Sequence, residues 1–494
     1  MRHILAIDEG TTGVTCLIIG EDGRVAGRGY REIKQHFPRP GWVEHDPLEI
    51  LECVRVAAGQ AIATADGLPV AIGITNQRET VVIWELATGR PVHRAIVWQD
   101  RRTAERCREL SARTDWITER TGLVPDPYFS ASKIEWLLRE QRLLERYTPA
   151  DLAVGTIDSW LIWQLTGGGV HATDATNASR TMLFDINKQQ WSDELCDVFG
   201  VPMAMLPEVR LSSGDFGVAR GELLGADAPI LGVAGDQQAA LFGQGCWTRG
   251  TGKNTYGTGA FLLLNAGMKR PTAGSGLLTT IACDASGGPA YALEAAIFIA
   301  GAAVQWLRDG LGIIETAADT ETLARSIEST DGVYFVPALT GLGAPHWESR
   351  ARGTIVGLTR GTGRAHIARA ALEAMAYGTA EVLANMRDES GASFERLRVD
   401  GGATNNDWLM QFQADILGVP VERPDMVETT ALGAAGLAGL AAGVWRDADE
   451  FLATRRFTRF TPRMDRSDAK RLMAGWQRAV GAAVAWARDD GQAE

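Results

Sequence analysis

The sequence predicts an α/β protein of two domains that face each other across a cleft. Its 494 residues amount to about three average domain lengths, and 45% of them are hydrophobic, so at least two packed units are expected. A turn rich in glycine and threonine leads into an apolar strand twice, first at residues 9–19 and again at residues 253–264. We therefore place one domain at residues 1–245 and the other at residues 246–494.

The first domain is expected to begin with a meander of strands. His3 to Asp8 and Val14 to Ile19 are apolar runs separated by a short turn, which is typical of a hairpin, and a third strand is expected around Val25. Asp46 and Pro47 have the character of the N-cap and first residue of a helix. Strands at residues 68–75 and 80–86, and helices at residues 101–111 and 132–146, are predicted to follow.

The same order of elements restarts in the second domain. After a strand that ends at residues 232–236, we expect a turn at residues 253–259 and an apolar strand at residues 261–264. Helices are expected to dominate beyond residue 297, most clearly at residues 408–417 and 430–444.

Charge and cysteine usage exclude several classes of function. The 49 basic and 61 acidic residues give a net charge of −12, which argues against a partner that is a nucleic acid or an anionic membrane. The six cysteines are scattered without a C-x-x-C pair, which favours unpaired thiols and a cytoplasmic location. We expect no secretory signal and no membrane span, because no apolar run reaches about 18 residues.

Three glycine elements could bind a nucleotide. Backbone N–H groups in a tight glycine turn form an anion-binding nest, and threonine hydroxyls add donors, so the turns at residues 9–13 and 256–259 would clamp a polyphosphate across the cleft. Asp8, at the end of the first strand, could hold Mg²⁺ through coordinated waters. The pair Gly401-Gly402 would let a flat ring lie on bare backbone. For each turn taken singly, an ordinary hairpin turn is the alternative.

The order of these elements resembles the actin-like ATPase superfamily, and within it the FGGY carbohydrate kinases. Two long patterns, Tyr128 to Leu137 and Gly353 to Glu373, are similar to the two signatures of that family. Further similarity, to the branch of the family that phosphorylates glycerol, lies at residues 40–47, 73–80, 97–102, 126–128, 176–184, 234–243 and 341–345. The resemblance implies two actin-like (ribonuclease H-like) ATPase domains flanking a catalytic cleft. It also implies the transfer of a phosphoryl group from Mg·ATP to glycerol, which would yield sn-glycerol 3-phosphate.

The resemblance assigns one group of residues to the polyol. The hydroxyl groups would be held by Arg78, Glu79, Tyr128, Asp236 and Gln237. Trp98 and Phe261 would wall the carbon chain and exclude water, and Asp236 would also act as the general base. Each of these side chains could instead have a purely structural role. Arg78 and Glu79 could form a surface ion pair, because neighbours on a strand point to opposite faces. The aromatic residues could belong to a core, and Asp236 could cap a helix.

A second group is assigned to the nucleotide and its metal ion. Phosphate contacts are implied for Thr11, Thr12, Gly13 and Thr258, and the Mg²⁺ site for Asp8. The rest of the nucleotide pocket would be lined by Gly301, Gln305, Gly402 and Asn406.

The sequence also departs from the family pattern. Glu9 stands where glutamine is usual, and Thr15 stands where an arginine usually contacts phosphate. We expect a loss of two units of positive charge near the triphosphate, which would weaken ATP binding or catalysis. The loop that binds fructose 1,6-bisphosphate in some bacterial members has no match between Asp215 and Pro229, and residues 462–475 lack the surface for a regulatory partner. We therefore expect neither form of control.

Assembly and function have alternatives at this stage. Relatives form dimers and tetramers, so the resemblance implies a homodimer or homotetramer. A kinase for a related polyol or ketose, such as erythritol or xylulose, would share most of these motifs. A nucleotide-switched, actin-like binding protein would share the phosphate turns without needing a polyol pocket.

Overall fold

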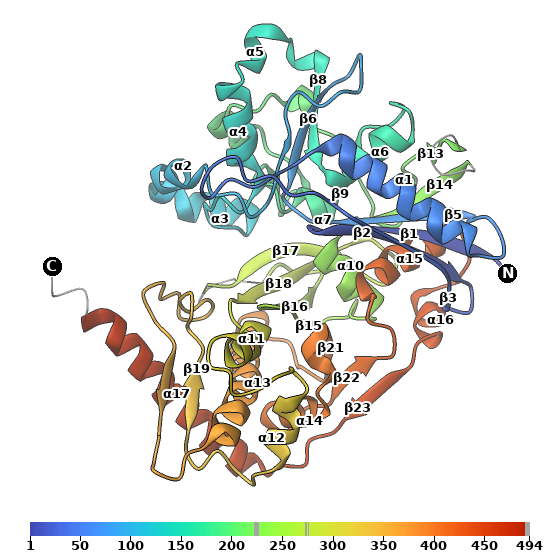
Figure 1. Ribbon diagram of the computed structural model, residues 1–494. Coiled ribbons are helices and arrows are strands. Elements are labelled where there is room, and N and C mark those ends of the chain that lie inside the picture. Colours follow the sequence, from blue (N-terminus) through green and yellow to red (C-terminus); the bar gives the residue numbers. More distant parts are fainter. Residues whose placement is uncertain (222–226, 272–273, 275, 490–494) are drawn as a thin grey trace.

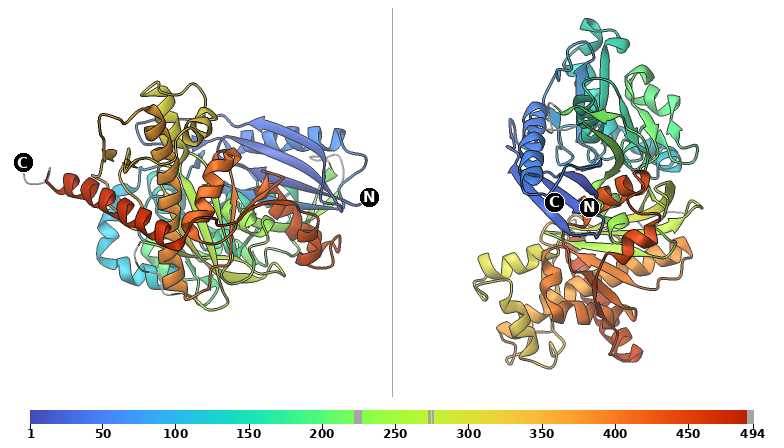
Figure 2. Two further views of the ribbon diagram at one scale, coloured as in Figure 1. Left: turned by 90° about the horizontal axis from the view of Figure 1, so that it is seen from below. Right: turned by 90° about the vertical axis from the view of Figure 1, so that its right-hand side faces the viewer.

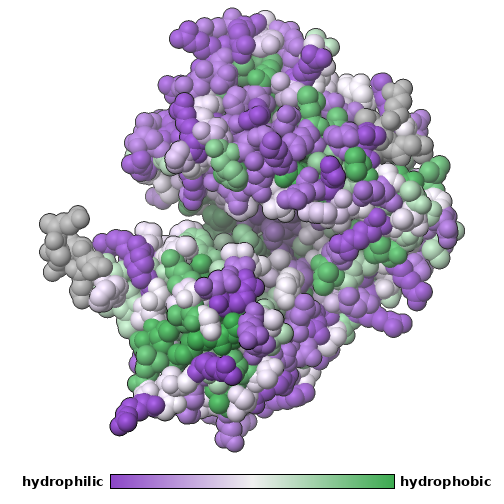
Figure 3. Space-filling view, viewed as in Figure 1, coloured by the Kyte–Doolittle hydropathy of each residue, from purple (hydrophilic) through white to green (hydrophobic). Residues whose placement is uncertain are grey.

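The computed structural model describes residues 1–221, 227–271, 274 and 276–489. Two α/β halves are stacked on each other, the N-terminal half above and the C-terminal half below in Figure 1, and the right-hand view of Figure 2 shows the same stacking from the side. The surface is hollowed between the halves (Figure 3). The predicted α/β class with two packed units is confirmed.

The sheet of the first half has the strand order β13-β14-β5-β1-β2-β3. Its first three strands, β1 (His3–Glu9), β2 (Gly13–Gly20) and β3 (Val25–Glu32), form the predicted antiparallel meander. The next two, β5 (Ala71–Asn76) and β14 (Ala228–Gly235), run parallel to β1, and β13 (Val218–Ala219) lies at the edge. Helix α1 (Pro47–Ala63) packs against β2 and β3, and Asp46 is its N-cap, as predicted.

The sheet of the second half has the order β17-β18-β16-β15-β21-β22-β23. Its strands are β15 (Gly252–Tyr256), β16 (Ala260–Gly267), β17 (Leu278–Cys283), β18 (Pro289–Ile297), β21 (Leu397–Asp400), β22 (Val421–Pro424) and β23 (Phe457–Phe460). The order β18-β16-β15-β21-β22 repeats β3-β2-β1-β5-β14, with the same parallel and antiparallel pairings. The two halves therefore share one topology, although their sequences are hardly similar.

The remaining elements of the first half surround its sheet. A smaller sheet contains β4 (Glu44–His45), β6 (Val81–Glu85), β7 (Ala95–Ile96) and β8 (Leu152–Thr156). Short strand pairs are formed by β9 (Ala172–Asp174), β10 (Phe184–Asp185), β11 (Gln190–Trp191) and β12 (Glu208–Arg210). The helices are α2 (Ala104–Glu109), α3 (Thr114–Thr121), α4 (Ser130–Glu140), α5 (Leu143–Arg146), α6 (Ile157–Leu165), α7 (Ala175–Ala178) and α8 (Asp193–Phe199).

In the second half, helices lie against the far side of the sheet (Figure 1). They are α11 (Gly301–Asp309), α12 (Asp319–Arg325), α13 (Arg364–Ser390), α14 (Asp407–Leu417) and α17 (Arg466–Asp489). Helix α16 (Ala448–Ala453) lies apart from them and packs on α15 (Thr429–Ala441). The strands β19 (Tyr334–Val336) and β20 (Thr354–Val356) form a separate pair. The strands beyond residue 297 have only three or four residues each, and the last described element is helix α17, so the expectation that helices dominate there is confirmed.

Two helices join the halves at close range. Helix α10 (Asp236–Gly243) packs on α15 (Thr429–Ala441), and α15 lies against β1, β5 and β14 of the first sheet. A Cβ at Gly433 would lie 1.8 Å from the carbonyl oxygen of Ala239, and a Cβ at Gly73 would lie 2.2 Å from that of Ala434. Glycine is therefore needed at both positions to let the backbones approach.

Some predicted boundaries are wrong for identifiable reasons. Residues 252–256 form strand β15 rather than part of a turn, because they pair with β16 on one side and β21 on the other. Only Gly257 to Gly259 remain for the turn. The helix predicted at residues 132–146 is two helices, since Arg142 between them has a φ of 46°. Part of the segment in which the bisphosphate-binding loop was sought, residues 222–226, lies outside the described residues.

The cysteines are unpaired, as their scattered spacing predicts. All six are free and buried. Across the ranges that the structure describes, we find no helix with the length and apolar character needed to cross a bilayer.

Candidate active site

Arg78 and Glu79 lie together just beyond the end of β5, where the first half of the chain meets the second. Glu79 has a φ of 65°, so the chain has left the strand there and both side chains can turn to the same side. Arg78 Nε lies 3.7 Å from Glu79 Oε1, and each side chain is only 2% exposed. The two residues are therefore a buried pair and not the surface pair that the sequence left open.

A charge network connects this pair to the second half of the chain. Arg78 donates to both carboxylate oxygens of Glu294 on β18, at 2.7 and 3.0 Å. Arg180 donates to Glu79 Oε1 at 2.7 Å and to Glu294 Oε1 at 3.1 Å. Arg78 Nε also lies 3.1 Å from Asp236 Oδ1. Three carboxylates thus share two guanidinium groups, with the halves joined through Glu294.

Burial and the charges of the two arginines shift the pKa values of these acids in opposite directions. Burial by itself raises the pKa of the Glu294 carboxyl, but the charges of Arg180 and Arg78 lower it to about 2. For Glu79, burial outweighs the same two arginines, and its pKa is raised. Of these two glutamates, Glu294 is therefore the one held firmly in its ionised form.

Only one carboxylate oxygen of Asp236, Oδ1, contacts other residues of the described chain. It is the first residue of α10, whose N-cap is Gly235, so it does not cap the helix through its side chain. Its Oδ1 accepts from Gln237 N at 2.7 Å and faces Arg78 Nε. Within the described chain, Oδ2 has no hydrogen-bond partner, and the side chain is 32% exposed. This free oxygen can accept a proton from a bound hydroxyl group.

The predicted aromatic residues stand next to these charges. Trp98 and Tyr128 meet edge to face with their ring centres 5.5 Å apart, and Arg78 donates to the Tyr128 hydroxyl at 3.5 Å. Trp98 Nε1 also donates to Thr11 Oγ1 at 2.8 Å, which ties this wall to the first glycine turn. Phe261 pairs in register with Ala296, two residues from Glu294, so it shares that face of the second sheet. All three rings are half-buried rather than enclosed in a core.

The first glycine turn joins β1 to β2. Gly10 N donates to Gly13 O at 3.0 Å, Thr11 is half-buried and Thr12 is exposed. A Cβ at Gly13 would lie 2.5 Å from the Tyr30 hydroxyl, so a larger residue there would have to displace the exposed Tyr30 side chain. The turn thus offers its threonine side chains and backbone N–H groups to a ligand, while Gly13 serves mainly to close it.

Asp8 lies at the start of this turn among other acids. Burial, followed by the charges of Asp236 and Glu428, raises its pKa to about 7. No group of three or more His, Cys, Asp and Glu side chains in the described ranges is arranged to hold a metal by itself. One carboxylate facing another, together with phosphate oxygens, is nevertheless a donor set that suits Mg²⁺, because this ion usually keeps several waters. A cation here would also relieve the repulsion that raises the pKa of Asp8.

The position of Glu9 changes the expected loss of charge at the first glycine turn. Its side chain is fully buried on the opposite sheet face from Asp8, where Oε1 accepts from Gln77 Nε2 at 2.7 Å. Burial raises the pKa of Glu9 well above its usual value, which favours the neutral form. A neutral carboxyl resembles the glutamine that is usual there. Thr15, by contrast, pairs in register with Asp8 and shares its face, so the missing arginine charge falls beside Asp8, whereas Glu9 lies on the opposite face.

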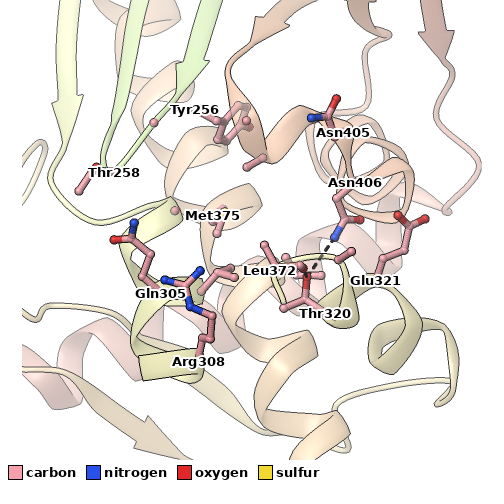
Figure 4. A pocket seen from close by; sticks show the side chains of 17 residues that line it. Tyr256, Thr258, Gln305, Arg308, Thr320, Glu321, Leu372, Met375, Asn405 and Asn406 are labelled. Atoms are coloured by element: carbon pink, nitrogen blue, oxygen red, sulfur yellow. Dashed lines mark hydrogen bonds between the residues drawn. The ribbon is translucent and has the colours of Figure 1, made fainter. Parts of the chain in front are cut away.

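A cavity of about 470 Å³ lies in the second half, between α11, α12 and the end of β21. Its lining contains all the predicted nucleotide residues of that half: Thr258, Gly301, Gln305, Gly402 and Asn406. Figure 4 shows Gln305 and Arg308 of α11 on one side and Asn405 and Asn406 on the other. Asn406 is also the N-cap of α14 and donates to Thr320 at 3.4 Å. The volume suits a ligand of the size of a nucleoside.

The glycines around this cavity are of two kinds. A Cβ at Gly301 would lie 2.5 Å from Gly257 O, and one at Gly401, where φ is 89°, would lie 2.2 Å from Tyr256 O. These two glycines are required by the protein's own backbone. At Gly402 nothing in the described chain lies within 4 Å of a Cβ, yet the residue lines the cavity. Its bare backbone is therefore left for a ligand to contact.

Sequence reasoning missed three charged residues of this site. Arg180, Lys253 and Glu294 are each at most 3% exposed and contact predicted site residues. The available signal was a single charge inside an otherwise apolar run, as in Pro289 to Ile297, where Glu294 stands alone. A lone charge on a buried strand calls for a partner elsewhere in the fold.

Both halves of the chain match one family of enzymes. Residues 3–243 match the N-terminal domain of the FGGY family of carbohydrate kinases, and residues 252–442 match its C-terminal domain. The chain belongs to the FGGY family of carbohydrate kinases. Among curated proteins, it is 52% identical to a glycerol kinase of Deinococcus radiodurans, covering 100% of this chain and 99% of that protein. It is 53% identical to a glycerol kinase of Chromobacterium violaceum, covering 99% of both.

Solved structures agree with this assignment. The structure of Plasmodium falciparum glycerol kinase with ADP superimposes with a TM-score of 0.93 at 38% identity, covering 98% of both chains. A xylulose kinase from Lactobacillus acidophilus superimposes with a TM-score of 0.89 at 21% identity, covering 100% of both chains. The second likeness is one of fold alone. The predicted two-domain fold and the predicted kinase class are thereby confirmed.

Proposed function

We propose that the protein transfers the γ-phosphoryl group of Mg·ATP to a terminal hydroxyl of glycerol and forms sn-glycerol 3-phosphate. The observation that carries this proposal is the free Oδ2 of Asp236, set beside Arg78 where the two halves of the chain meet. The curated relatives, 52–53% identical over nearly the whole chain, are glycerol kinases, which supports glycerol as the substrate.

The polyol would lie against Arg78, Glu79, Trp98, Tyr128, Asp236, Gln237 and Phe261. Glu79 and Asp236 each engage one carboxylate oxygen with arginine, and their second oxygens have no partner in the described part of the chain. These oxygens can accept hydrogens from hydroxyl groups, while the Tyr128 hydroxyl can donate one. A short triol that both donates and accepts matches this set, and the rings of Trp98 and Phe261 would cover its carbon atoms.

The nucleotide would occupy the 470 Å³ cavity, with its base against Gly402 and its phosphates between the two glycine turns. Thr258 would contact phosphate from the second half, and Thr11, Thr12 and the Gly13 turn from the first. Gly301, Gln305 and Asn406 would complete the pocket. Asp8 would hold Mg²⁺, which when bound neutralises charge on the phosphates being transferred.

In the reaction, Asp236 Oδ2 would accept the proton of the attacking hydroxyl group. Arg78 holds Oδ1 of the same carboxylate, so the free oxygen keeps a fixed direction. Phosphoryl transfer depends mainly on position and charge neutralisation, so the placement of the hydroxyl should matter more than the strength of the base.

An assay of ADP release tests the proposal. Glycerol, dihydroxyacetone, glyceraldehyde, erythritol and xylulose are compared, and glycerol should give the highest kcat/KM. Asp236→Asn should lower kcat by about 100-fold or more while leaving ATP binding intact, because it removes the proton acceptor. A higher kcat/KM for xylulose or erythritol would make the protein a kinase of that compound. ATP hydrolysis that no polyol changes would favour a nucleotide-switched binding protein.

We further propose the domain limits 1–245 and 246–494 and a cytoplasmic location. The family matches at residues 3–243 and 252–442 support the limits. The six free, buried cysteines support a reducing compartment, since no disulfide joins them in the structure of the described chain.

A further inference from the structure

Lys253 is a buried cation at the cleft that none of the roles above uses. It lies on β15 and is fully buried. Leu263 of β16 pairs in register with Lys253 on one side and with Glu294 on the other, so both charged residues share the face that meets the first half. Keeping an ammonium group out of water is costly unless it is paired, so its partners indicate what it does.

Those partners are two oxygen atoms. Lys253 Nζ donates to the side-chain oxygen Oε1 of Gln237 and, at 2.7 Å, to Thr255 Oγ1. Burial lowers the pKa of Lys253, while the charges of Asp400 and Asp236 favour its protonated form. The ammonium group carries three donors and no acceptor.

The hydrogen bond from Lys253 Nζ to Gln237 Oε1 fixes the orientation of the Gln237 amide. Because an ammonium group can only donate, the Gln237 oxygen must face Lys253, and the NH₂ group must point away from it. That NH₂ group has no partner in the described chain, and the Gln237 side chain is half-buried beside Asp236. A flipped amide would place its NH₂ group against the ammonium and leave Lys253 with Thr255 Oγ1 as its one remaining acceptor in the described chain.

We propose that Lys253 is a positioning residue that turns the Gln237 amide so that it donates to a polyol hydroxyl group. This inference rests on the proposed function, in which Gln237 contacts the polyol. A hydroxyl group that gives its hydrogen to a carboxylate such as Asp236 still has lone pairs to fill, and an NH₂ donor at Gln237 meets that need. Lys253 thereby sets the pattern of donors and acceptors that the pocket offers.

A double-mutant cycle tests the proposal. Lys253→Met keeps most of the apolar stem and removes the ammonium group. It should raise the KM for glycerol by up to about tenfold, the upper end of what one hydrogen bond between neutral groups contributes, with the KM for ATP unchanged. Gln237→Ala should have an effect at least as large. The double variant should match Gln237→Ala alone, because Lys253 acts through Gln237. Additive effects, an unchanged KM for glycerol in Lys253→Met, or a raised KM for ATP would each overturn the proposal.

A second variant keeps the test decisive if Lys253→Met fails to fold, as judged by thermal unfolding. Gln237→Glu keeps an oxygen facing Lys253 and replaces the NH₂ group by a second oxygen. It should fold and should raise the KM for glycerol about tenfold. An unchanged KM would show that no donor is needed there and would overturn the proposal.

The wild-type substrate panel separates this inference from the proposed function. If the wild type prefers another polyol or a ketose, the proposed function fails, and the cycle is repeated with that substrate. Non-additivity of Lys253→Met and Gln237→Ala on that substrate would uphold the positioning role, and additivity would overturn it.

Discussion

Replacing Glu294 with glutamine should weaken the connection between the two halves of the molecule. Glu294 holds Arg78 and Arg180 of the first half from a strand of the second. The lowering of its pKa from 4.5 to about 2 corresponds to about 3 kcal/mol of stabilisation. Removing one partner of a buried ion pair typically costs about 3–5 kcal/mol. The two values agree, so we expect Glu294→Gln to lower the free energy of unfolding by about 3 kcal/mol at neutral pH.

The pH dependence gives this prediction a sharper test. A depressed carboxyl pKa stabilises the fold above the unfolded value of 4.5, and the stabilisation disappears as pH falls through about 2. The difference between wild type and Glu294→Gln should therefore be constant above about pH 5 and about halved at pH 3.

Urea unfolding, followed by tryptophan fluorescence, measures the difference in stability between wild type and Glu294→Gln. The control is Glu52→Gln, which removes an exposed partner of Arg55 and should leave stability essentially unchanged. The Glu294→Gln variant should also bind glycerol more weakly, because Arg78 loses its anchor. Equal stability of wild type and Glu294→Gln at pH 7, or a difference that grows towards low pH, would refute the reasoning.

Three further predictions concern the nucleotide side. Thr15→Arg should lower the KM for ATP about tenfold by restoring a charge-assisted bond beside Asp8, and an unchanged KM would mean that the missing charge has been overestimated. Gly402→Ala should leave thermal unfolding unchanged but raise the KM for ATP at least about tenfold, whereas Gly401→Ala should destabilise the fold. Because burial and nearby acids raise the pKa of Asp8 to about 7, the binding of Mg·ATP should strengthen from pH 6 to pH 8 as that carboxyl ionises. Calorimetric titration at several pH values measures this, and affinity independent of pH would contradict it.

Local features of the fold could be predicted from the sequence. Asp46 is an N-cap, as predicted, and an N-cap depends on the residues directly after it. The turn at residues 9–13 is likewise visible between two apolar runs. In each case the information lies within a few neighbouring residues, so no knowledge of the tertiary fold is needed.

Partners that are distant in the chain could not be predicted in the same way. Glu294 meets Arg78 and Arg180, 216 and 114 residues away, only because β18 faces the first half in the folded chain. The need for glycine at Gly401 comes from the backbone of Tyr256, and not from a phosphate or a base. The number of glycines near a motif therefore does not show which of them are needed for packing and which contact a ligand.

The repeated topology explains why the two glycine turns differ in charge. The first joins β1 to β2, and the second joins β15 to β16, the equivalent strands. Counting back from Gly10 and Gly257 makes Glu9 equivalent to Tyr256, and Asp8 to Thr255.

Burial agrees with this alignment. Glu9 and Tyr256 are both fully enclosed, whereas Asp8 and Thr255 are both half-buried on the ligand face. The acid suited to Mg²⁺ therefore occurs only at the first turn, and at the second the equivalent residue is a hydroxyl that Lys253 binds. The first turn therefore carries an acid on this face, and the second carries the cation of Lys253, so a substrate bound between them in the proposed way would meet an acid suited to Mg²⁺ on one side and a positive charge on the other. A duplicated fold can thus supply two different halves of one site.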